Sequence, residues 1–421
     1  MWYRDEPESV RALLERQRLD PSFPTWVRPS YDGYGVVNLP WTVLDILGAP
    51  VEGTPLAPEL VPATLREGVR VVVLIVVDAL SYFQLREGMR TGDTPVLAKM
   101  WEEGAAFALT STFPSTTVAA LTALQTGVPP SQHGMVAYTC YLREFGMLSN
   151  LIRFSPIGRF DSYAATGFDP GTFLPVSTIY ERAASAGVAA EMINYRSFQH
   201  SPLTRIQGRG AAYRGYRTLG EFGTVIRRAI AEPGRRLIFA YWPMIDLIGH
   251  IEGPEGDTSI ADLRLLDALL GREVFDHARD DVLFILTADH GQVQLDPDQV
   301  FSLNEAPDLL ADLRVPPAGE RRVGYFHPRA GREEAVRERL RELAGERGAV
   351  VEGADLLDQG MYGPGPLYPE VPSRVGDLVL LARGPATFPY TAVGDPAEPM
   401  LGAHGSLEAE EMLVPCLLWR R

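Results

Sequence analysis

Short apolar runs alternate with amphipathic segments over most of the chain. The run Val71–Val77 is entirely aliphatic, and the runs at 188–193, 237–241 and 282–287 are apolar on both faces. Strands with two apolar faces lie between layers of helices. The pattern therefore predicts an α/β fold, with a doubly wound, largely parallel sheet that has helices on both faces.

The spacing of these runs divides the chain into three predicted parts. Residues 1–67 contain one amphipathic helix, near residues 9–17, and then an arm rich in Pro, Gly and Tyr that we expect to pack on the core. Residues 68–293 and 392–421 are predicted to form the core. Residues 294–391 are predicted to form a small α+β cap insertion.

The cap prediction depends on a change in periodicity. A helical pattern over 332–346 stands between strand-like runs at 322–326 and 377–382. A second segment, 138–172, is rich in Gly, Phe, Tyr and Arg, and we expect it to overhang the ligand site. The last apolar run, 412–418, is a candidate strand of the main sheet.

Composition narrows the classes of function. The formal net charge of −15 opposes binding to a nucleic-acid polymer, although a small phosphate ester could still dock on bound cations. The longest apolar run is strand-sized, so no membrane association is expected. The charged start, without an apolar signal-peptide core, predicts a cytoplasmic location. Cys140 and Cys416 are expected to be reduced thiols.

Several metal-binding residue types follow the apolar runs directly. Asp78 comes after the first run, and Asp289 and His290 come after the run Val282–Thr287. Asp246 and His250 are four residues apart, so both point the same way on a helix. Taken one at a time, each has a structural explanation, such as helix capping by Asp78. Ligands in doubly wound sheets nevertheless bind beyond the carboxyl ends of the strands.

A further histidine, His404, lies between Gly402 and Gly405, which permit a close approach of the backbone. Three aspartates and three histidines together make two nitrogen and oxygen half-sites, which are the ligands that zinc prefers. Mn²⁺ and Fe are the alternatives. The first predicted half-site consists of Asp78, Asp289 and His290, and the second consists of Asp246, His250 and His404.

A nucleophile is available beside these residues. The segment 111–117 is dense in hydroxyl groups and leads into a predicted helix, 118–125, which we expect to end at Gly127. A hydroxyl at a helix start is most often only an N-cap. The same position also lies in the positive field of the helix N-terminus, which favours a phosphate group. The residues alone do not choose between Thr116 and Thr117.

This set of motifs resembles that of the alkaline phosphatase superfamily, and within it the type I phosphodiesterase/nucleotide pyrophosphatase family. The resemblance covers the chain from about residue 70 to its end. The motifs that carry it are Val77-Asp78, Thr117 with Thr126-Gly127, His133-Gly134, Asp246 with Gly249-His250 and Gly253-Pro254, Asp289-His290-Gly291, and His404-Gly405.

The resemblance implies the mechanism and the nucleophile. In the family the nucleophilic threonine stands ten residues before the glycine of the Thr-Gly pair, and here that residue is Thr117. Thr117 would also be a metal ligand. Thr117 would attack phosphorus with two Zn²⁺ ions stabilising charge, and water would then hydrolyse the phosphothreonine.

One position departs from the family pattern. The family places an Asn shortly after the His-Gly pair, where it holds a phosphate oxygen, and this chain has Tyr138 there. Tyr138, Asn150 and Arg153 are therefore the candidate substrate-binding residues. The departure leaves the reaction class intact and leaves specificity for nucleotides open.

The sequence thus predicts a two-metal phosphohydrolase that cleaves phosphodiester or pyrophosphate bonds in a small substrate such as a nucleotide. A phosphomonoesterase on the same site is the alternative enzyme, which Arg153 favours, whereas the aromatic insertion favours a diesterase. A non-catalytic zinc-binding protein is a weaker alternative, because no expected ligand is missing. The sequence does not indicate an oligomeric state.

Overall fold

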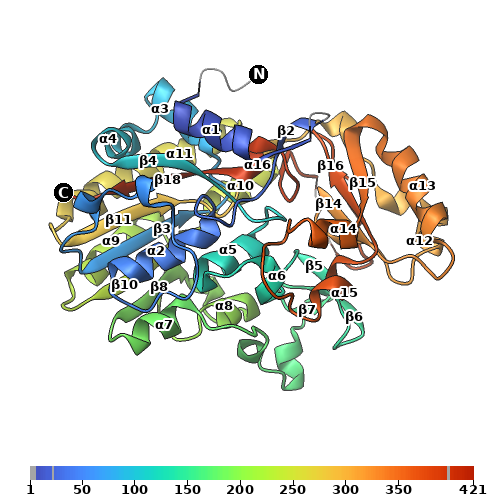
Figure 1. The fold of residues 1–421 in the computed structure, drawn as a ribbon, viewed down its shortest axis with the longest axis horizontal. Coiled ribbons are helices and arrows are strands. Elements are labelled where there is room, and N and C mark those ends of the chain that lie inside the picture. The colour runs from blue at the N-terminus through green and yellow to red at the C-terminus, as the bar shows by residue number, and fades with distance from the viewer. Residues whose placement is uncertain (1–5, 21–22, 396–398) are drawn as a thin grey trace.

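Two seven-stranded sheets organise the protein (Figure 1). The structure is a computed structural model that describes residues 6–20, 23–395 and 399–421. The larger sheet, on the left in Figure 1, contains the strands predicted from the apolar runs. Its order is β4 (Ala105–Thr110), β18 (Leu413–Trp419), β11 (Val282–Thr287), β3 (Val71–Val77), β10 (Arg236–Trp242), β8 (Ala189–Tyr195), β9 (Ala212–Tyr216).

The strands of the larger sheet run parallel, with the exception of β18. Strand β18 pairs antiparallel with both β11 and β4, so it enters the sheet in the opposite direction. Strand β3 is central, and all seven of its residues are buried. Its neighbours β10 and β11 are buried along their whole length as well, which agrees with their apolar runs.

Helices flank the larger sheet in two groups, as the doubly wound pattern predicts. One group consists of α2 (Leu39–Ile46), α5 (Thr117–Thr126) and α7 (Ile179–Ser185), which contact one another. The other consists of α4 (Pro95–Glu103), α9 (Leu219–Ala231) and α11 (Asp257–Leu269), joined through α11. The predicted α/β fold class is confirmed. In the described part of the chain no helix has both the length and the apolarity to cross a membrane.

The N-terminal part contains one helix more than the sequence predicts. The amphipathic helix is α1 (Glu8–Arg16), and the additional helix is α2, six of whose eight residues are buried. Trp41 of α2 donates a hydrogen bond to the carbonyl of Gly127 at 2.5 Å. A helix buried on nearly every side has no polar face, so its sequence lacks the amphipathic signal that revealed α1.

The second sheet takes strands from two separate segments. Helix α13 (Glu333–Ala344) packs on β15 and β16, as predicted for the cap. Strands from 139–156 share this sheet, and the domain limits at 294 and 391 stay a prediction. The order is β15 (Gly348–Glu352), β16 (Leu378–Ala382), β14 (Val323–Phe326), β13 (Ala318–Gly319), β5 (Thr139–Leu142), β6 (Met147–Asn150), β7 (Ser155–Pro156).

The remaining elements are short apart from the two helices that follow β3 and β10. Two small antiparallel sheets join β1 to β2 and β12 to β17. These elements are β1 (Arg18–Asp20), β2 (Phe23–Val27), α3 (Tyr82–Thr91), α6 (Pro130–His133), α8 (Pro202–Gln207), α10 (Met244–Glu252), β12 (Val293–Gln294), α12 (Pro307–Ala311), α14 (Gly353–Asp358), α15 (Val371–Val375), β17 (Gly402–Ala403), α16 (Ala409–Met412).

A fully buried ion pair connects the two sheets. Arg322, next to β14, binds both carboxylate oxygens of Glu411 in α16, at 2.8 and 2.9 Å. Neither side chain is exposed to solvent. The backbone N–H of Ser406 also donates to Glu411, at 3.0 Å. The pair therefore fixes the second sheet against the loop that follows β17.

We expect Glu411→Gln to destabilise the protein strongly. The change leaves the Arg322 guanidinium buried without its counter-charge, which costs about 3–5 kcal/mol of unfolding free energy. Urea unfolding followed by circular dichroism measures it. Asp377→Asn is the control, because the Arg314–Asp377 pair is half exposed and contributes less than about 1 kcal/mol. Equal losses of unfolding free energy in the two variants would show that burial of the Arg322–Glu411 pair does not increase its contribution to stability.

Candidate active site

Three neighbouring strands bring the predicted carboxylates to one edge of the larger sheet. Asp78 directly follows β3, Asp289 follows β11 after one residue, and Asp246 lies in the first turn of α10 after β10. Strand β3 lies between the other two, and its last residues pair with the ends of both. The carboxyl ends of parallel strands meet at the same edge, so these three side chains converge.

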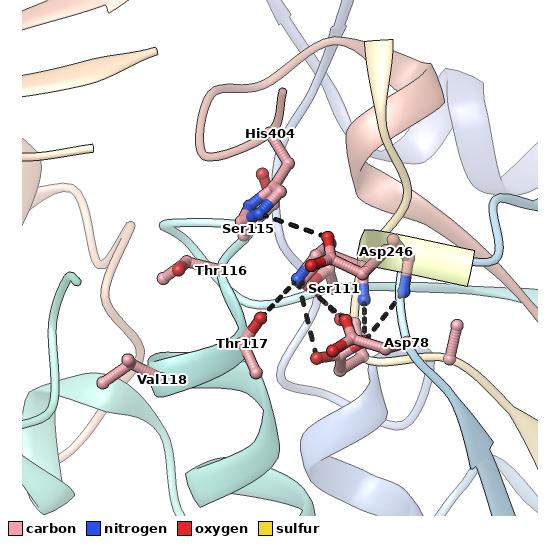
Figure 2. Close-up of polar contacts among 12 residues, drawn as sticks. Asp78, Ser111, Ser115, Thr116, Thr117, Val118, Asp246 and His404 are labelled. Atoms are coloured by element: carbon pink, nitrogen blue, oxygen red, sulfur yellow. Dashed lines mark hydrogen bonds and ion pairs between the residues drawn. The ribbon is translucent and has the colours of Figure 1, made fainter. Parts of the chain in front are cut away.

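Thr117 lies against the first predicted half-site. The Nε2 atom of His290 is 3.5 Å from Oδ1 of Asp78 and 3.6 Å from Oδ2 of Asp289. The same Nε2 atom lies 3.0 Å from Oγ1 of Thr117. Figure 2 shows Thr117 turned toward Asp78 and Asp246, whereas the next residue, Val118, points away.

The second half-site forms around Asp246. Its Oδ1 atom lies 3.3 Å from Nε2 of His250 and 3.6 Å from Nε2 of His404. The rings of His290 and His404 stack with centroids 3.8 Å apart, so the two half-sites adjoin. The structure thus brings together all seven residues predicted to bind metal, which come from five segments of the chain.

Backbone carbonyl groups fix the tautomers of the three histidines. The Nδ1 atoms of His250 and His404 lie 2.9 Å from the carbonyl oxygens of Gly402 and Ser115. Nδ1 of His290 lies 3.0 Å from the carbonyl oxygen of its neighbour in sequence. A carbonyl oxygen only accepts, so each Nδ1 carries a proton and donates it. Each Nε2 atom is thereby oriented toward the carboxylates, as in the outer shell of zinc sites.

The buried carboxylates lack enough hydrogen-bond donors. Oδ1 of Asp78 and Oδ2 of Asp289 have no hydrogen-bond partner among the described residues. Burial, together with the charges of Asp289 and Asp246, raises the pKa of Asp78 well above its usual value. Burial also raises the pKa of Asp289. A bound cation stabilises buried carboxylates that repel one another and lack hydrogen-bond donors. The residues of this site therefore fit a divalent metal ion.

The electrostatics of the second half-site also indicate a cation. Burial by itself would raise the pKa of Asp246, but the charges of His250 and His404 outweigh burial and lower this pKa. Although burial favours the neutral ring, Asp246 raises the pKa of His250 to about 9. The Asp246 carboxylate thus holds a proton on its neighbour in the metal-free protein, in the position where a metal ion would act.

Three supporting residues were missed from the sequence. The Tyr241 hydroxyl donates to Oδ2 of Asp78, and Nε2 of Gln292 donates to Oδ1 of Asp246 at 2.7 Å. Gln292 follows the Asp289-His290-Gly291 motif, a position that could have drawn attention. The third residue, Glu320, gave no signal, because it comes from the loop between β13 and β14. Burial raises the pKa of Glu320 to about 7.

The structure distinguishes Thr116 from Thr117. Helix α5 begins at Thr117 and ends before Gly127, which adopts the left-handed conformation expected of it (φ 75°). Every residue of α5 after Thr117 is buried, whereas Thr117 is partly exposed. The Thr116 hydroxyl instead donates to Oε1 of Glu320 at 2.6 Å. Thr117 is therefore the hydroxyl that faces the carboxylates, in the field of the helix N-terminus.

A cavity of about 420 Å³ lies between the two sheets above Thr117. Thr117 and the second half-site form part of its wall. The side chains from the second sheet and the loops around it are largely apolar or aromatic. These residues are Tyr138, Ile152, Ile157, Leu303, Phe388 and Tyr390.

The three predicted substrate-binding residues lie in different surroundings. Tyr138 and Arg153 line the cavity, and Asn150 does not. Oδ1 of Asn150 accepts hydrogen bonds from the backbone N–H groups of Ile152 and Arg153, at 3.0 and 2.9 Å, so Asn150 shapes a turn. The Arg153 guanidinium forms an ion pair with Asp395 at 3.0 Å.

Solved structures with the same fold support this architecture. Murine ectonucleotide pyrophosphatase/phosphodiesterase 5 is 19% identical, with 83% of this chain and 88% of that chain covered and a TM-score of 0.64. Phosphonoacetate hydrolase from Sinorhizobium meliloti 1021, in complex with phosphonoformate, is 17% identical, with 84% and 90% covered and a TM-score of 0.64. No curated protein matches the chain by sequence.

The fold and the match to a family model together define a phosphoester hydrolase of the alkaline phosphatase superfamily. The family model for type I phosphodiesterase/nucleotide pyrophosphatase matches residues 72–407. The chain belongs to this family, and the predicted resemblance is confirmed.

We expect the metal-free protein to be more stable as Asp289→Asn than as wild type. The amide removes a buried charge that repels Asp78 and Asp246 when no cation is bound. With zinc at about 100 times its Kd, the wild type should gain about 3 kcal/mol, and the variant less. Thermal unfolding with chelator and with zinc measures both effects.

Asp267→Asn is the matched control for this reversal. Asp267 is also buried, but its oxygens accept hydrogen bonds from the backbone N–H groups of Val96 and Leu97, at 3.1 and 2.8 Å. The control variant should lose stability with and without zinc. If Asp289→Asn behaves like Asp267→Asn, the carboxylate cluster does not bind metal.

Proposed function

We propose that the protein is a two-metal phosphohydrolase that cleaves phosphodiester or pyrophosphate bonds through a covalent phosphothreonine at Thr117. One observation carries the proposal: the Thr117 hydroxyl lies 3.0 Å from His290 Nε2, beside buried carboxylates and at the wall of a cavity. A hydroxyl that only caps a helix does not have to lie beside a histidine and buried carboxylates.

The proposed metals are two zinc ions, with Mn²⁺ or Fe as alternatives. Asp78, Asp289, His290 and Thr117 would hold one ion, and Asp246, His250 and His404 would hold the other. Bound divalent ions supply Lewis acidity and positive charge next to a transferring phosphoryl group. The imidazole and carboxylate mixture favours zinc over harder cations.

The chain's own residues account for the two displacements. Thr117 Oγ1 forms a bond to phosphorus, its proton leaves to solvent, and the bond from phosphorus to the leaving oxygen breaks. The N-terminus of α5 points at the same place, so its backbone N–H groups favour the negative phosphoryl oxygens. Water then attacks phosphorus, the bond from phosphorus to Thr117 Oγ1 breaks, a proton returns to Oγ1, and the phosphate product leaves.

Two features of the cavity favour a diesterase over a monoesterase. Arg153, the group that could hold an additional phosphate oxygen, is paired with Asp395. The apolar and aromatic wall suits the second ester group of a diester. Nucleotides are the first natural substrates to test, since aromatic side chains stack on bases and an inactive variant of the murine neighbour was solved in complex with AMP.

We expect the zinc-loaded protein to hydrolyse bis-p-nitrophenyl phosphate with a higher kcat/KM than p-nitrophenyl phosphate. Thr117→Ala should lower the diesterase kcat by about 10³-fold or more, because the covalent step is lost. Absorbance at the p-nitrophenolate band measures both rates. Acid quenching and mass spectrometry of the wild type should find the phosphoryl adduct on the peptide that contains Thr117.

Thr116→Ala is the matched control for the nucleophile. Its hydroxyl binds Glu320 rather than the half-sites, so this variant should keep most of the kcat. Loss of activity in Thr116→Ala with activity kept in Thr117→Ala would contradict the assignment of the nucleophile. A wild type that binds zinc and turns over neither ester would contradict the proposed function.

A further inference from the structure

A carboxylate from the second sheet occupies two hydrogen-bond donors beside the nucleophile. Oε1 of Glu320 accepts from the Thr116 hydroxyl and from the backbone N–H of Tyr138, both at 2.6 Å. Glu320, Thr116 and Tyr138 all line the cavity. The hydrogen bonds of this carboxylate to described residues are both made by Oε1, and Glu320 is partly exposed. Glu320 thus places negative charge at the wall of the cavity.

A second carboxylate, Asp395, binds the guanidinium group of Arg153. Oδ1 of Asp395 binds the Arg153 guanidinium at 3.0 Å, and Oδ2 accepts from the backbone N–H of Gly158 at 3.2 Å. Arg153 and Asp395 both line the cavity. Arg321 lines it too and has an interaction partner of its own.

Hydroxyl groups, backbone N–H groups and guanidinium groups are the donors that proteins use to hold phosphoryl oxygens. Around Thr117, one donor of each of these types already binds a carboxylate oxygen from Glu320 or Asp395. A phosphoryl oxygen would have to displace a charge-assisted hydrogen bond to reach any of them. The cavity therefore does not offer these donors to an additional anionic oxygen.

Charge sets the direction of the resulting selectivity. A phosphodiester is a monoanion, whereas a phosphomonoester or inorganic phosphate is mainly a dianion at pH 8. A like charge at about 10 Å weakens binding by roughly tenfold at an effective dielectric constant of about 20. The Glu320 carboxylate repels the second negative charge of a dianion. It does not repel the second ester group of a diester, because that group is uncharged.

We propose that Glu320 and Asp395 are specificity-determining residues, whose carboxylates disfavour dianionic phosphomonoesters and so select phosphodiester monoanions. This inference rests on the proposed phosphohydrolase function. It assigns the choice of substrate class to the second sheet, whereas the reacting groups come from the larger sheet. If Glu320 had a purely structural role, Glu320→Gln would leave the preference between the two substrate classes unchanged. Glutamine keeps the Oε1 acceptor and changes only the charge.

The test compares kcat/KM for the two nitrophenyl esters at pH 8 in zinc-loaded wild type and Glu320→Gln. The variant should gain about tenfold on the monoester and change less than about threefold on the diester. Asp395→Asn releases Arg153 and should shift the ratio of the two kcat/KM values in the same direction. This variant replaces Glu320→Gln in the test if Glu320→Gln does not fold. Glu334→Gln, on the exposed face of α13, removes a charge far from the cavity and should leave the ratio unchanged.

A binding measurement separates this inference from the proposed function. Calorimetry on zinc-loaded Thr117→Ala should show inorganic phosphate binding about fivefold more tightly or better when Glu320→Gln is added, and diphenyl phosphate unchanged. Unchanged ratios and unchanged phosphate affinity in both variants would overturn the inference. A wild type that prefers the monoester would also overturn it. If the wild type hydrolyses neither ester, the proposed function fails and the two affinities still decide the role of Glu320.

Discussion

Repulsion among three carboxylates at the ends of β3, β10 and β11 is the constraint on which the rest of the structure depends. Asp78 and Asp289 are buried, each has an oxygen without a donor among the described residues, and their pKa values are raised. Such an arrangement costs free energy by itself. It persists because three fully buried parallel strands over-determine where their ends lie. The folding of the aliphatic core thus holds the three carboxylates together at one edge of the sheet before any ligand is present.

Hydrogen bonds connect the loops around the carboxylates to one another. Nδ1 of His404 donates to the carbonyl of Ser115, two residues before Thr117, and the Ser115 hydroxyl donates to the carbonyl of Ser406 at 2.8 Å. The backbone N–H of Ser406 in turn binds Glu411, the partner of the buried Arg322 from the second sheet. One continuous set of hydrogen bonds therefore links the loop before Thr117, the loop with His404 and the second sheet. A change in the position of any of the three would move the others.

The two sheets have different tasks in the proposed enzyme. The larger sheet and its loops supply the nucleophile and the metal-binding groups, all near the carboxyl ends of its strands. The second sheet and its loops supply the apolar wall and the carboxylates that face the cavity. Reaction class can therefore stay the same while the second sheet changes the substrate. This division agrees with a family model that spans 72–407 and with neighbours less than 20% identical that have the same fold.

The sequence by itself determined the strands β3, β10 and β11 and the metal-binding residue types that follow them, because strands with two apolar faces have an unmistakable local pattern. It also ranked Thr117 as the nucleophile, through the family motif. Only the tertiary structure decided the direction of β18, the burial of α2, the sheet shared by β5 and β16, and the place of Glu320 beside Thr116. These features depend on pairing between residues that are far apart in the chain, such as 116 and 320. No local periodicity encodes such contacts, because their free energy arises only when the separate segments pack together.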